Sequence, residues 1–359
     1  MYYDRKLHRV RDLASGGTRM YLEFESRRIL CRHCRAVKQE TLAWLAAGGR
    51  FTQRFENEIG RLCRDMPVSR VAQIHRLGWE QVHRMEMAYM ERLLDRNPIP
   101  SDIRAIGIDE ISIRKGHNYR IVISDLDRKR PIWMGREGRS EEDLDPFFEG
   151  IGPVRSAGIQ IAVMDMWKAF RNSTLAHAPN VRIIFDKFHV IRHLSKALDE
   201  VRRREVKRVN EKERKFIKGQ RYTLLSNRVN LSREGRRSLK LLLKANKRLH
   251  KAYLLKESFG QLWDYYNPAW ARKFFDNWKA QLRWQRLKPF EEFTALIERH
   301  WDGIVSYCHS DNKVSLGFVE GLNNKIRVIQ RRAYGIKDQE YLRLKVLTSF
   351  IPDAPENPH

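Results

Sequence analysis

Three acidic residues stand at positions where a charge is costly. Asp109 follows the apolar run 105–108, Asp165 ends the mainly apolar run 159–164, and Glu320 heads an amphipathic helical segment. A carboxylate in a buried strand is destabilising unless it is paired, protonated or bound to a cation. Hard cations such as Mg²⁺ take carboxylate oxygens and complete their shell with water and substrate phosphate. The pattern therefore predicts a metal-dependent active site.

The chain is strongly basic. It carries 70 Lys and Arg against 44 Asp and Glu, a net charge of +26 in 359 residues. Such a field attracts polyanions, so we predict double-stranded DNA as the partner. The sequence has no apolar run of roughly 18 residues and no apolar leader, and we expect a soluble, intracellular protein with no membrane role.

The cysteines are few. Cys31 and Cys34 form one Cys-x-x-Cys pair, while Cys63 and Cys308 are isolated. This is not a disulfide framework, and it fits a reducing compartment. At this length we expect two or three domains with cores of their own.

The N-terminal part divides into two predicted regions. Residues 1–50 carry a Gly-Gly turn at 16–17, a short alternating run at 20–25 and the Cys pair, as a small module would. Residues 51–97 have a helical pattern, in which Ala72, Gly78 and Val82 have the spacing of a helix-turn-helix. Any helical hairpin can give this spacing, but the basic flanks favour DNA binding. The predicted DNA contacts are Arg76, Trp79, Gln81, His83 and Arg84.

Two prolines at 98 and 100 mark a linker, after which the pattern changes to strands. Strands are predicted at about 104–113, 118–126 and 130–136, then a helix from Ser140. Two more strands follow at 159–165 and 181–186, separated by a helix near 166–177. Three strands joined by short turns, then strand, helix and strand, predict an α/β fold with a mixed sheet.

Residues from about 190 to 309 show no strand signal. The window 201–250 holds 18 Lys and Arg against 4 Glu, which fits either a solvated helical surface or a groove for phosphates. We favour phosphate contact, with Arg202, Arg203 and Arg204 as candidates. The aromatic residues of 263–284 have helical spacing, which favours a helix core over stacking on bases.

The last helix is predicted to start near 316 or 317. One stripe of it is apolar, and a neighbouring stripe combines Glu320 with an amide, either Asn323 or Asn324, and with basic residues. A carboxylate, an amide and guanidinium groups on one edge suit a site for a metal and a phosphodiester. The candidates for DNA contact here are Lys325, Arg327, Arg331 and Arg332.

Three other acidic residues compete with or support this set. Glu110 is a rival of Asp109, because successive strand residues face opposite sides and only one can reach the site. Asp186 could cap the following helix or support the metal ligands, together with His189 and Asn324. Glu298 is a weaker candidate for the third ligand, because its sequence is ordinary helix.

Several separated motifs occur in an order that resembles a known family. They are Gly-Ile-Asp109-Glu with Lys115-Gly-His, Asp186-Lys-Phe-His189-Val, Glu320-Gly-Leu-Asn-Asn-Lys-Ile, and Arg331-Arg-Ala-Tyr-Gly. This set resembles the ISL-three family of bacterial insertion-sequence transposases over most of the chain. The resemblance implies a ribonuclease-H-like catalytic domain interrupted by a long all-helical insertion. By position, the family's Asp, Asp, Glu triad falls on Asp109, Asp165 and Glu320.

The resemblance also implies a function. We expect a DDE transposase that binds terminal inverted repeats and performs Mg²⁺-dependent strand cleavage and strand transfer, with Mn²⁺ as a substitute. In the expected two-metal mechanism Asp109 bridges both ions. Lys115 is a further expected DNA contact, and we expect a homo-oligomer, at least a dimer on DNA, in the bacterial cytoplasm at the nucleoid.

The expected division has six parts. It comprises the N-terminal module (1–50), the helix-turn-helix domain (51–97), the first part of the catalytic domain (98–190), the basic helical insertion (191–309), the second part of the catalytic domain (310–350) and a tail (351–359).

The chain departs from the family in one respect. The family typically opens with a zinc module built from two Cys pairs, and here only Cys31 and Cys34 are present. A closed zinc site needs four ligands, so this pair is at most part of one. His8, His33 and Cys63 are the substitutes to consider, and none has the spacing of a zinc ligand. We expect an N-terminus that starts after the first pair.

Two rival functions remain open. One is an inactive DNA-binding repressor derived from a transposase, against which the three intact acidic positions argue. The other is a nuclease that cuts without joining. Metal-dependent cleavage separates the first from a transposase, and joined products separate the second.

Overall fold

The structure is a computed structural model, and it describes residues 2–114, 118–314 and 317–353. The chain forms two compact units, one made of Met1–Ile99 with Gly321–His359 and the other of Pro100–Glu320. Helix α15 (Gly317–Arg332) begins in the second unit and ends in the first. None of the helices in these ranges has the length and apolar character needed to cross a bilayer.

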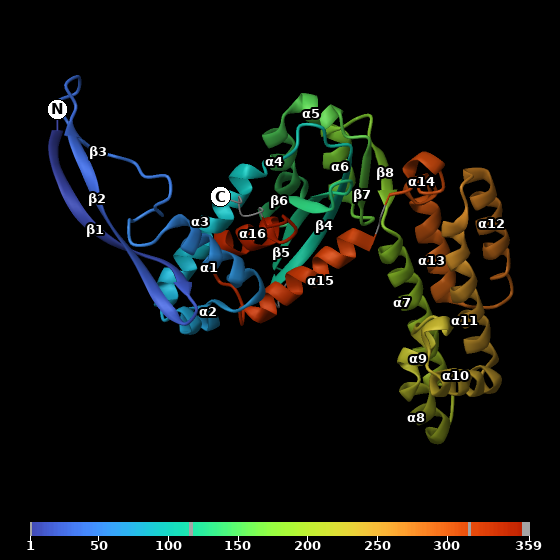
Figure 1. The fold of residues 1–359 in the computed structure, drawn as a ribbon. Helices are drawn as coiled ribbons and strands as arrows, with labels where there is room; N and C mark the ends of the chain where they lie inside the picture. The colour runs from blue at the N-terminus through green and yellow to red at the C-terminus, as the bar shows by residue number, and fades with distance from the viewer. Residues whose placement is uncertain (1, 115–117, 315–316, 354–359) are drawn as a thin grey trace. The chain divides into compact units, whose positions relative to one another are not determined.

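The unit of residues 100–320 is built on a five-stranded sheet, so the predicted mixed α/β fold is confirmed (Figure 1). The strand order is β6-β5-β4-β7-β8, with antiparallel pairing on one side of β4 and parallel pairing on the other. The strands are β4 (Ala105–Arg114), β5 (Asn118–Asp125), β6 (Arg130–Glu137), β7 (Ile161–Met164) and β8 (Arg182–Phe185). All five lie where the apolar runs of the sequence predict them.

One face of this sheet is covered by the start of α15. Ala105, Val163 and Ile184 form a buried cluster with Val319 of α15. Gly107 allows the close approach, because a Cβ atom there would lie 2.8 Å from Cγ2 of Val319. The return of the chain to the sheet after the long insertion therefore depends on a position without a side chain.

Three helices lie on the opposite side of the sheet from α15. These are α4 (Glu141–Ile151), α5 (Pro153–Ala157) and α6 (Lys168–His177). Phe147 of α4 packs on Trp133 of β6, with ring centroids 5.9 Å apart. The helix begins after Ser140, whose backbone N–H is bonded by Asp143, as the acidic first turn predicts.

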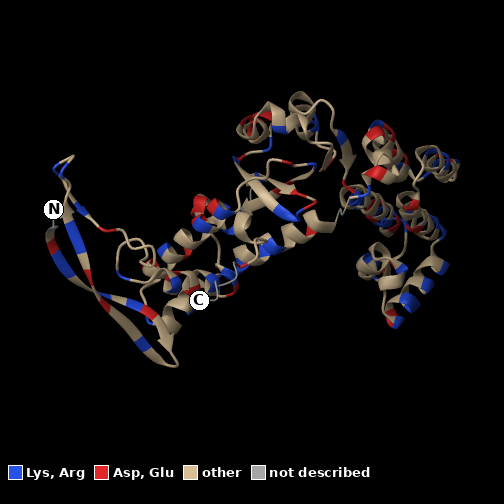
Figure 2. Cartoon of the chain, turned by 45° about the horizontal axis from the view of Figure 1, so that its top comes forward, with Lys and Arg blue, Asp and Glu red and all other residues tan. Residues whose placement is uncertain are grey.

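The insertion between β8 and α15 is helical, as predicted. Its α-helices are α7 (Lys187–Val206), α8 (Glu211–Gly219), α9 (Arg221–Leu225), α10 (Arg233–Ala245), α11 (Lys247–Phe259), α12 (Pro268–Ala280), α13 (Lys288–Arg299) and α14 (Trp301–Ser306). Lys and Arg recur along them, with fewer Asp and Glu interspersed (Figure 2). Helix α14 packs closely on β8, where Gly303 lies against the ring of Phe185.

Aromatic residues form the core of the insertion, which confirms the favoured interpretation of this run for its buried members. Trp278 packs edge-on against Phe259 and Phe293 and donates its indole N–H to the Leu255 carbonyl. Others of the same run are exposed: Tyr266, Trp270 and Trp284. A stacking role therefore stays open for these exposed side chains.

The other unit opens with a long two-stranded ribbon, β1 (Tyr2–Ser15) and β2 (Thr18–Leu30), followed by β3 (Val37–Gln39) (Figure 1). The turn falls at the predicted Gly-Gly pair, where Gly16 has a φ of 58°. Asp12 ties the ribbon to the next helix, because it accepts hydrogen bonds from Thr52 and Arg54. The Arg54 guanidinium lowers the pKa of this carboxyl to about 2.

Three helices follow the ribbon: α1 (Gln53–Asp65), α2 (Val68–His75) and α3 (Trp79–Arg96). Ala72 and Val82 are buried in one core with Phe55 and Ile59, so the predicted close crossing of α2 and α3 is confirmed. Arg76 makes the turn with a φ of 51°. Helix α16 (Gln339–Thr348) packs on α3, where Tyr341 donates a hydrogen bond to Glu86 at 2.6 Å.

We predict that Gly107→Ala destabilises the unit of residues 100–320 by about 1–3 kcal/mol, because the new methyl overpacks against Val319. Thermal unfolding followed by circular dichroism measures the loss. Gly150→Ala in α4 is the matched control, since no atom lies within 4 Å of the position that its Cβ would take. Equal stability of the two variants would show that the first turn of α15 does not pack tightly on β4.

Candidate active site

Three aspartates lie at one edge of the sheet. The parallel register aligns the last paired positions of β7 and β8 with Ile108 of β4, and each position is followed by an aspartate. These are Asp109, Asp165 and Asp186. Strand alternation places Asp109 on the face of Gly107, the face that α15 covers. Parallel pairing thus brings together residues that are far apart in the sequence.

Backbone groups hold these carboxylates. Asp109 accepts a hydrogen bond from the N–H of Glu110 at 2.7 Å, and Asp165 accepts one from Met166 at 2.6 Å. Asp109 is 7% exposed, whereas the Asp165 side chain is 36% exposed. The site therefore opens toward solvent at Asp165.

Asp109 and Glu110 lie on opposite faces of the sheet, which decides between the two candidates. Glu110 is on the opposite face, and Arg139 approaches its carboxylate at 3.4 Å. The Arg139 guanidinium lies over the rings of Tyr119 and Trp167 as well. Asp109 is therefore the one of the pair on the α15 face.

Asp186 caps helix α7, as one of its two predicted roles required. Its side chain accepts from the N–H of Phe188 at 2.9 Å. Its other oxygen lies 3.4 Å from Nδ1 of His189. Nε2 of the same ring lies 4.0 Å from an Asp165 oxygen, so His189 stands between two of the aspartates.

The charge of His189 reflects this setting. Burial by itself lowers its pKa, but Asp186, Asp165 and Asp109 act in the opposite direction and raise the pKa to about 9. In the metal-free protein the ring is therefore an imidazolium at neutral pH. The sheet edge concentrates enough negative charge to hold a cation against the cost of desolvation.

Glu320 lies on the first turn of α15 and is exposed. Its neighbour Val319 packs against the sheet at Gly107, two residues before Asp109. In the described part of the chain, no three His, Cys, Asp or Glu side chains come together as a preformed metal site. The structure thus places Glu320 on the helix that packs beside the aspartates, without a closed ligand cluster.

The helix-turn-helix residues that are predicted to contact DNA differ in exposure and in the hydrogen bonds they make within the protein. Trp79 is 53% exposed and stacks on His83 with ring centroids 4.9 Å apart. Arg76 and Arg84 are exposed. Gln81 uses its side-chain oxygen to accept from the Gly78 N–H, which fixes the start of α3.

Comparison with known proteins agrees with this arrangement. Residues 106–346 match the DDE domain of ISL3, described as a transposase, and residues 40–89 match the helix-turn-helix domain of transposase family ISL3. The chain belongs to the ISL3 family of transposases. It is 34% identical over 355 residues to the transposase for insertion sequence element IS1001 of Bordetella parapertussis, across 98% of this chain and 86% of that protein. It is 28% identical to the transposase for insertion sequence element IS1557 of Mycobacterium tuberculosis, across 99% and 85% of the two chains.

The two family matches follow the elements of this ISL3 transposase. The helix-turn-helix match covers α1, α2 and most of α3. The DDE match starts in β4, includes the whole helical insertion and ends in α16. The long basic insertion is thus part of the family domain.

The three arginines of the insertion that are predicted to contact DNA differ in exposure. Arg202 is 7% exposed and paired with Asp199 at 2.7 Å, so burial argues against a phosphate contact there. Arg203 pairs with Asp199, and Arg204 pairs with Glu200. Both arginine side chains nevertheless remain partly exposed. Glu298, the weaker candidate for a metal ligand, pairs with Lys279 of the insertion.

The basic residues on the second half of α15 belong to the other unit. Arg327 and Arg331 are exposed, and Arg327 donates to Asn324 at 3.0 Å. Arg332 donates to the Arg64 carbonyl, while Lys325 lies 4.7 Å from the Phe350 ring centroid. Lys115 lies outside the described residues.

The Cys pair forms a tight turn after β2. Backbone N–H groups of Cys34 and His33 point at the Cys31 sulfur and lower its pKa to about 7. Two of the substitutes considered for zinc are engaged elsewhere: His8 bonds Ser26 at 2.7 Å, and Cys63 is buried in the helix-turn-helix core. Neither can join the pair as a ligand.

One residue near the aspartates was not predicted from the sequence. His193 follows His189 by one helical turn and interacts with the Asp165 charge, although burial lowers its pKa. The His-x-x-x-His spacing on α7 could have indicated it. Arg139, which pairs with Glu110 on the opposite face of the sheet, was not predicted either; it lies in the loop before α4, and no motif marks it.

We predict that Cys31 of the metal-free protein is alkylated by iodoacetamide with a half-maximal rate near pH 7. A lowered pKa makes the reactive thiolate abundant above that pH, whereas an ordinary thiol requires about 8.5. Mass spectrometry of the labelled peptides measures the rate. Cys63 is the control, because burial raises its pKa to about 12 and it should stay unmodified in the native protein. A Cys31 profile centred near 8.5 would contradict the turn geometry.

Proposed function

We propose that this transposase binds the terminal inverted repeats of an insertion sequence and cleaves and joins DNA strands there, with Asp109, Asp165 and Glu320 as its catalytic carboxylates. The observation that carries the proposal is the alignment of Asp109 and Asp165 on adjacent parallel strands, on the side where α15 brings Glu320. The strand order of the sheet supports a ribonuclease-H-like core. The printed names of the relatives, transposases of insertion sequence elements, support the substrate class.

A DDE transposase domain implies the use of a divalent metal, and the residues present fit one. The aspartates concentrate negative charge strongly enough to raise the pKa of His189, and their oxygens are the ligand type that Mg²⁺ or Mn²⁺ prefers. Asp109, Asp165 and Glu320 would hold the ions. When bound, such ions would make water or a 3′ hydroxyl more nucleophilic and stabilise the leaving oxygen.

The protein's own side chains would position these ligands. Asp186 is fixed by the α7 backbone and holds Nδ1 of His189. His189 in turn faces Asp165 and partly neutralises it, which keeps the carboxylates together at the sheet edge. Arg327, which donates a hydrogen bond to Asn324 on α15, would contact DNA.

DNA would be held by both units. In our proposal the helix-turn-helix of residues 51–97 reads the repeats through the start of α3, and the insertion of residues 191–309 contacts flanking phosphates with Arg203 and Arg204. Two element ends must be joined at one place, so we propose at least a dimer on DNA. Such a protein would act at the nucleoid.

We predict that Asp109→Asn, Asp165→Asn and Glu320→Gln each abolish cleavage of labelled duplexes that carry the sequences flanking the gene, with Mg²⁺ or Mn²⁺ present. Each change removes a charged ligand and keeps the shape, so DNA affinity should stay within about threefold. His189→Ala should slow cleavage about 10- to 100-fold, as loss of a group that orients a ligand does.

The matched control is Glu298→Gln, an exposed glutamate of the insertion that should leave cleavage unchanged. Cleavage that persists in Asp109→Asn would disprove its role. Tight binding without cleavage by the wild type would favour the repressor, and cleavage without joined products would favour a nuclease.

We also predict that Arg84→Ala reduces the slope of log affinity against log salt by about 1, because one phosphate contact is lost. Affinity should fall similarly for repeat and unrelated DNA, as measured by fluorescence anisotropy at several salt concentrations. Arg96→Ala, an exposed arginine at the other end of α3, should change neither quantity. An equal effect of both substitutions would argue against binding through the start of the helix.

A further inference from the structure

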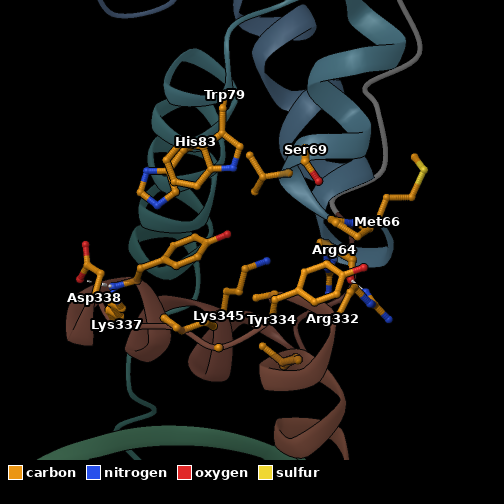
Figure 3. A pocket seen from close by; sticks show the side chains of 17 residues that line it. Arg64, Met66, Ser69, Trp79, His83, Arg332, Tyr334, Lys337, Asp338 and Lys345 are labelled. Carbon is orange, nitrogen blue, oxygen red and sulfur yellow. Dashed lines mark hydrogen bonds between the residues drawn. The ribbon is translucent and has the colours of Figure 1, made fainter.

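A pocket of about 430 Å³ lies in the unit of residues 1–99 and 321–353, beside the start of α3 (Figure 3). Trp79 and His83 of α3 form one wall, and Tyr334 lies on another side, in the loop between α15 and α16. The helix proposed to read DNA thus also forms one wall of a cavity. Its volume suits a group of the size of one nucleotide.

Tyr334 occupies a backbone position that favours glycine. The N–H of Gly335 bonds the Gln330 carbonyl and the N–H of Tyr334 bonds the Arg331 carbonyl, which is the hydrogen-bond pattern of a Schellman helix end. In this pattern Tyr334 is the residue with left-handed conformation, and its φ is 53°. A large side chain at such a position is strained, and strain of this kind is retained where the side chain has a function.

The side chain of Tyr334 gains little stabilisation from packing, because the rest of the protein buries very little of it. It is 91% exposed, although it lines the pocket. Packing therefore does not compensate for the strain. A planar ligand that enters the pocket would provide the missing contact.

The opposite wall is a fixed aromatic column. Trp79 stacks on His83 at 4.9 Å, and His83 lies 4.5 Å from the ring of Tyr341. The hydroxyl of Tyr341 donates to buried Glu86, which Lys345 approaches at 2.5 Å. Buried bonds hold the base of the column in place, while the indole face of Trp79 stays half exposed.

The charge around the pocket suits a phosphate. Among the described residues that line it, Asp338 is the one acidic residue, and its carboxylate is occupied in capping α16 through the N–H groups of Glu340 and Tyr341. Arg332 lies beside Tyr334, and the exposed Lys337 lies on the other side of the pocket, next to Asp338 (Figure 3). An aromatic surface with cations at its rim is the chemistry that binds an unstacked base and its phosphate.

We propose that this pocket receives one unpaired nucleotide of the DNA that the helix-turn-helix binds, with its base against the ring of Tyr334 and its phosphate near Arg332. The proposal rests on the proposed DNA binding and adds a site that takes a nucleotide out of the duplex. Removing a base from its stack costs energy, and the cost is smallest where pairing is already absent.

The test compares duplexes of the flanking sequences that are fully paired with duplexes that carry one unpaired nucleotide at each position in turn. At one position the unpaired nucleotide should tighten binding by the wild type about 5- to 150-fold, the effect of one base stacked on an aromatic side chain. Fluorescence anisotropy gives the dissociation constants. Tyr334→Ala should lose this gain, and Tyr334→Phe should keep it because the ring remains.

Two controls separate binding from folding. Tyr222→Ala removes another exposed tyrosine, 76% exposed in the insertion, and should keep the gain. Tyr334→Gly should lose the gain while the melting temperature stays equal or rises, since glycine relieves the strained conformation.

Absence of a gain at every position, or a gain that survives in Tyr334→Ala, would overturn the pocket while leaving duplex binding intact. Failure of the wild type to bind either kind of duplex would overturn the proposed function as well. The two failures are therefore distinguishable in one set of titrations.

Discussion

The packing of Val319 into the space above Gly107 is the contact on which the rest of the candidate site depends. The chain leaves the sheet after β8, builds the helices α7 to α14, and packs on the sheet again through α14 and the first turn of α15. Because Gly107 has no side chain, the first turn of α15 can approach the strand that carries Asp109 two residues later. Without this approach, Glu320 would have no fixed relation to the aspartates.

Negative charge is concentrated near that contact, although the chain as a whole is positive. The chain as a whole is strongly positive, yet the sheet edge gathers Asp109, Asp165 and Asp186, with His189 held protonated among them. Such a local negative site within a positive field suits a protein that must attract a polyanion and yet hold cations next to it. The pairing of Arg202 with Asp199 shows that part of the positive charge is structural. The net charge alone therefore overstates the surface offered to DNA.

Local pattern predicted the regular elements well. The five apolar runs became the five strands, and the insertion is helical throughout its described residues, because periodicity and turn residues act over short distances. The ribbon was underestimated: only the run at 20–25 was predicted, whereas β1 and β2 span 14 and 13 residues. Its exposed faces mix charged and apolar side chains, so the alternation is weak. Of the candidate site, the sequence indicated the acidic residues but could not tell Asp109 from Glu110, and it missed His193.

The α/β class, the helical insertion, the helix-turn-helix and the acidic positions could all be predicted from the amino-acid sequence. These follow from hydrophobic spacing and residue type, which are properties of short segments. Three features emerged from the folded chain alone: Asp109 shares a face with α15, Arg202 is buried against Asp199, and Tyr334 is exposed at a strained helix end across a pocket from Trp79. These features depend on strand register and on packing between elements that are distant in the chain. A local sequence pattern does not identify the partners that determine which way a side chain points and how deeply it is buried.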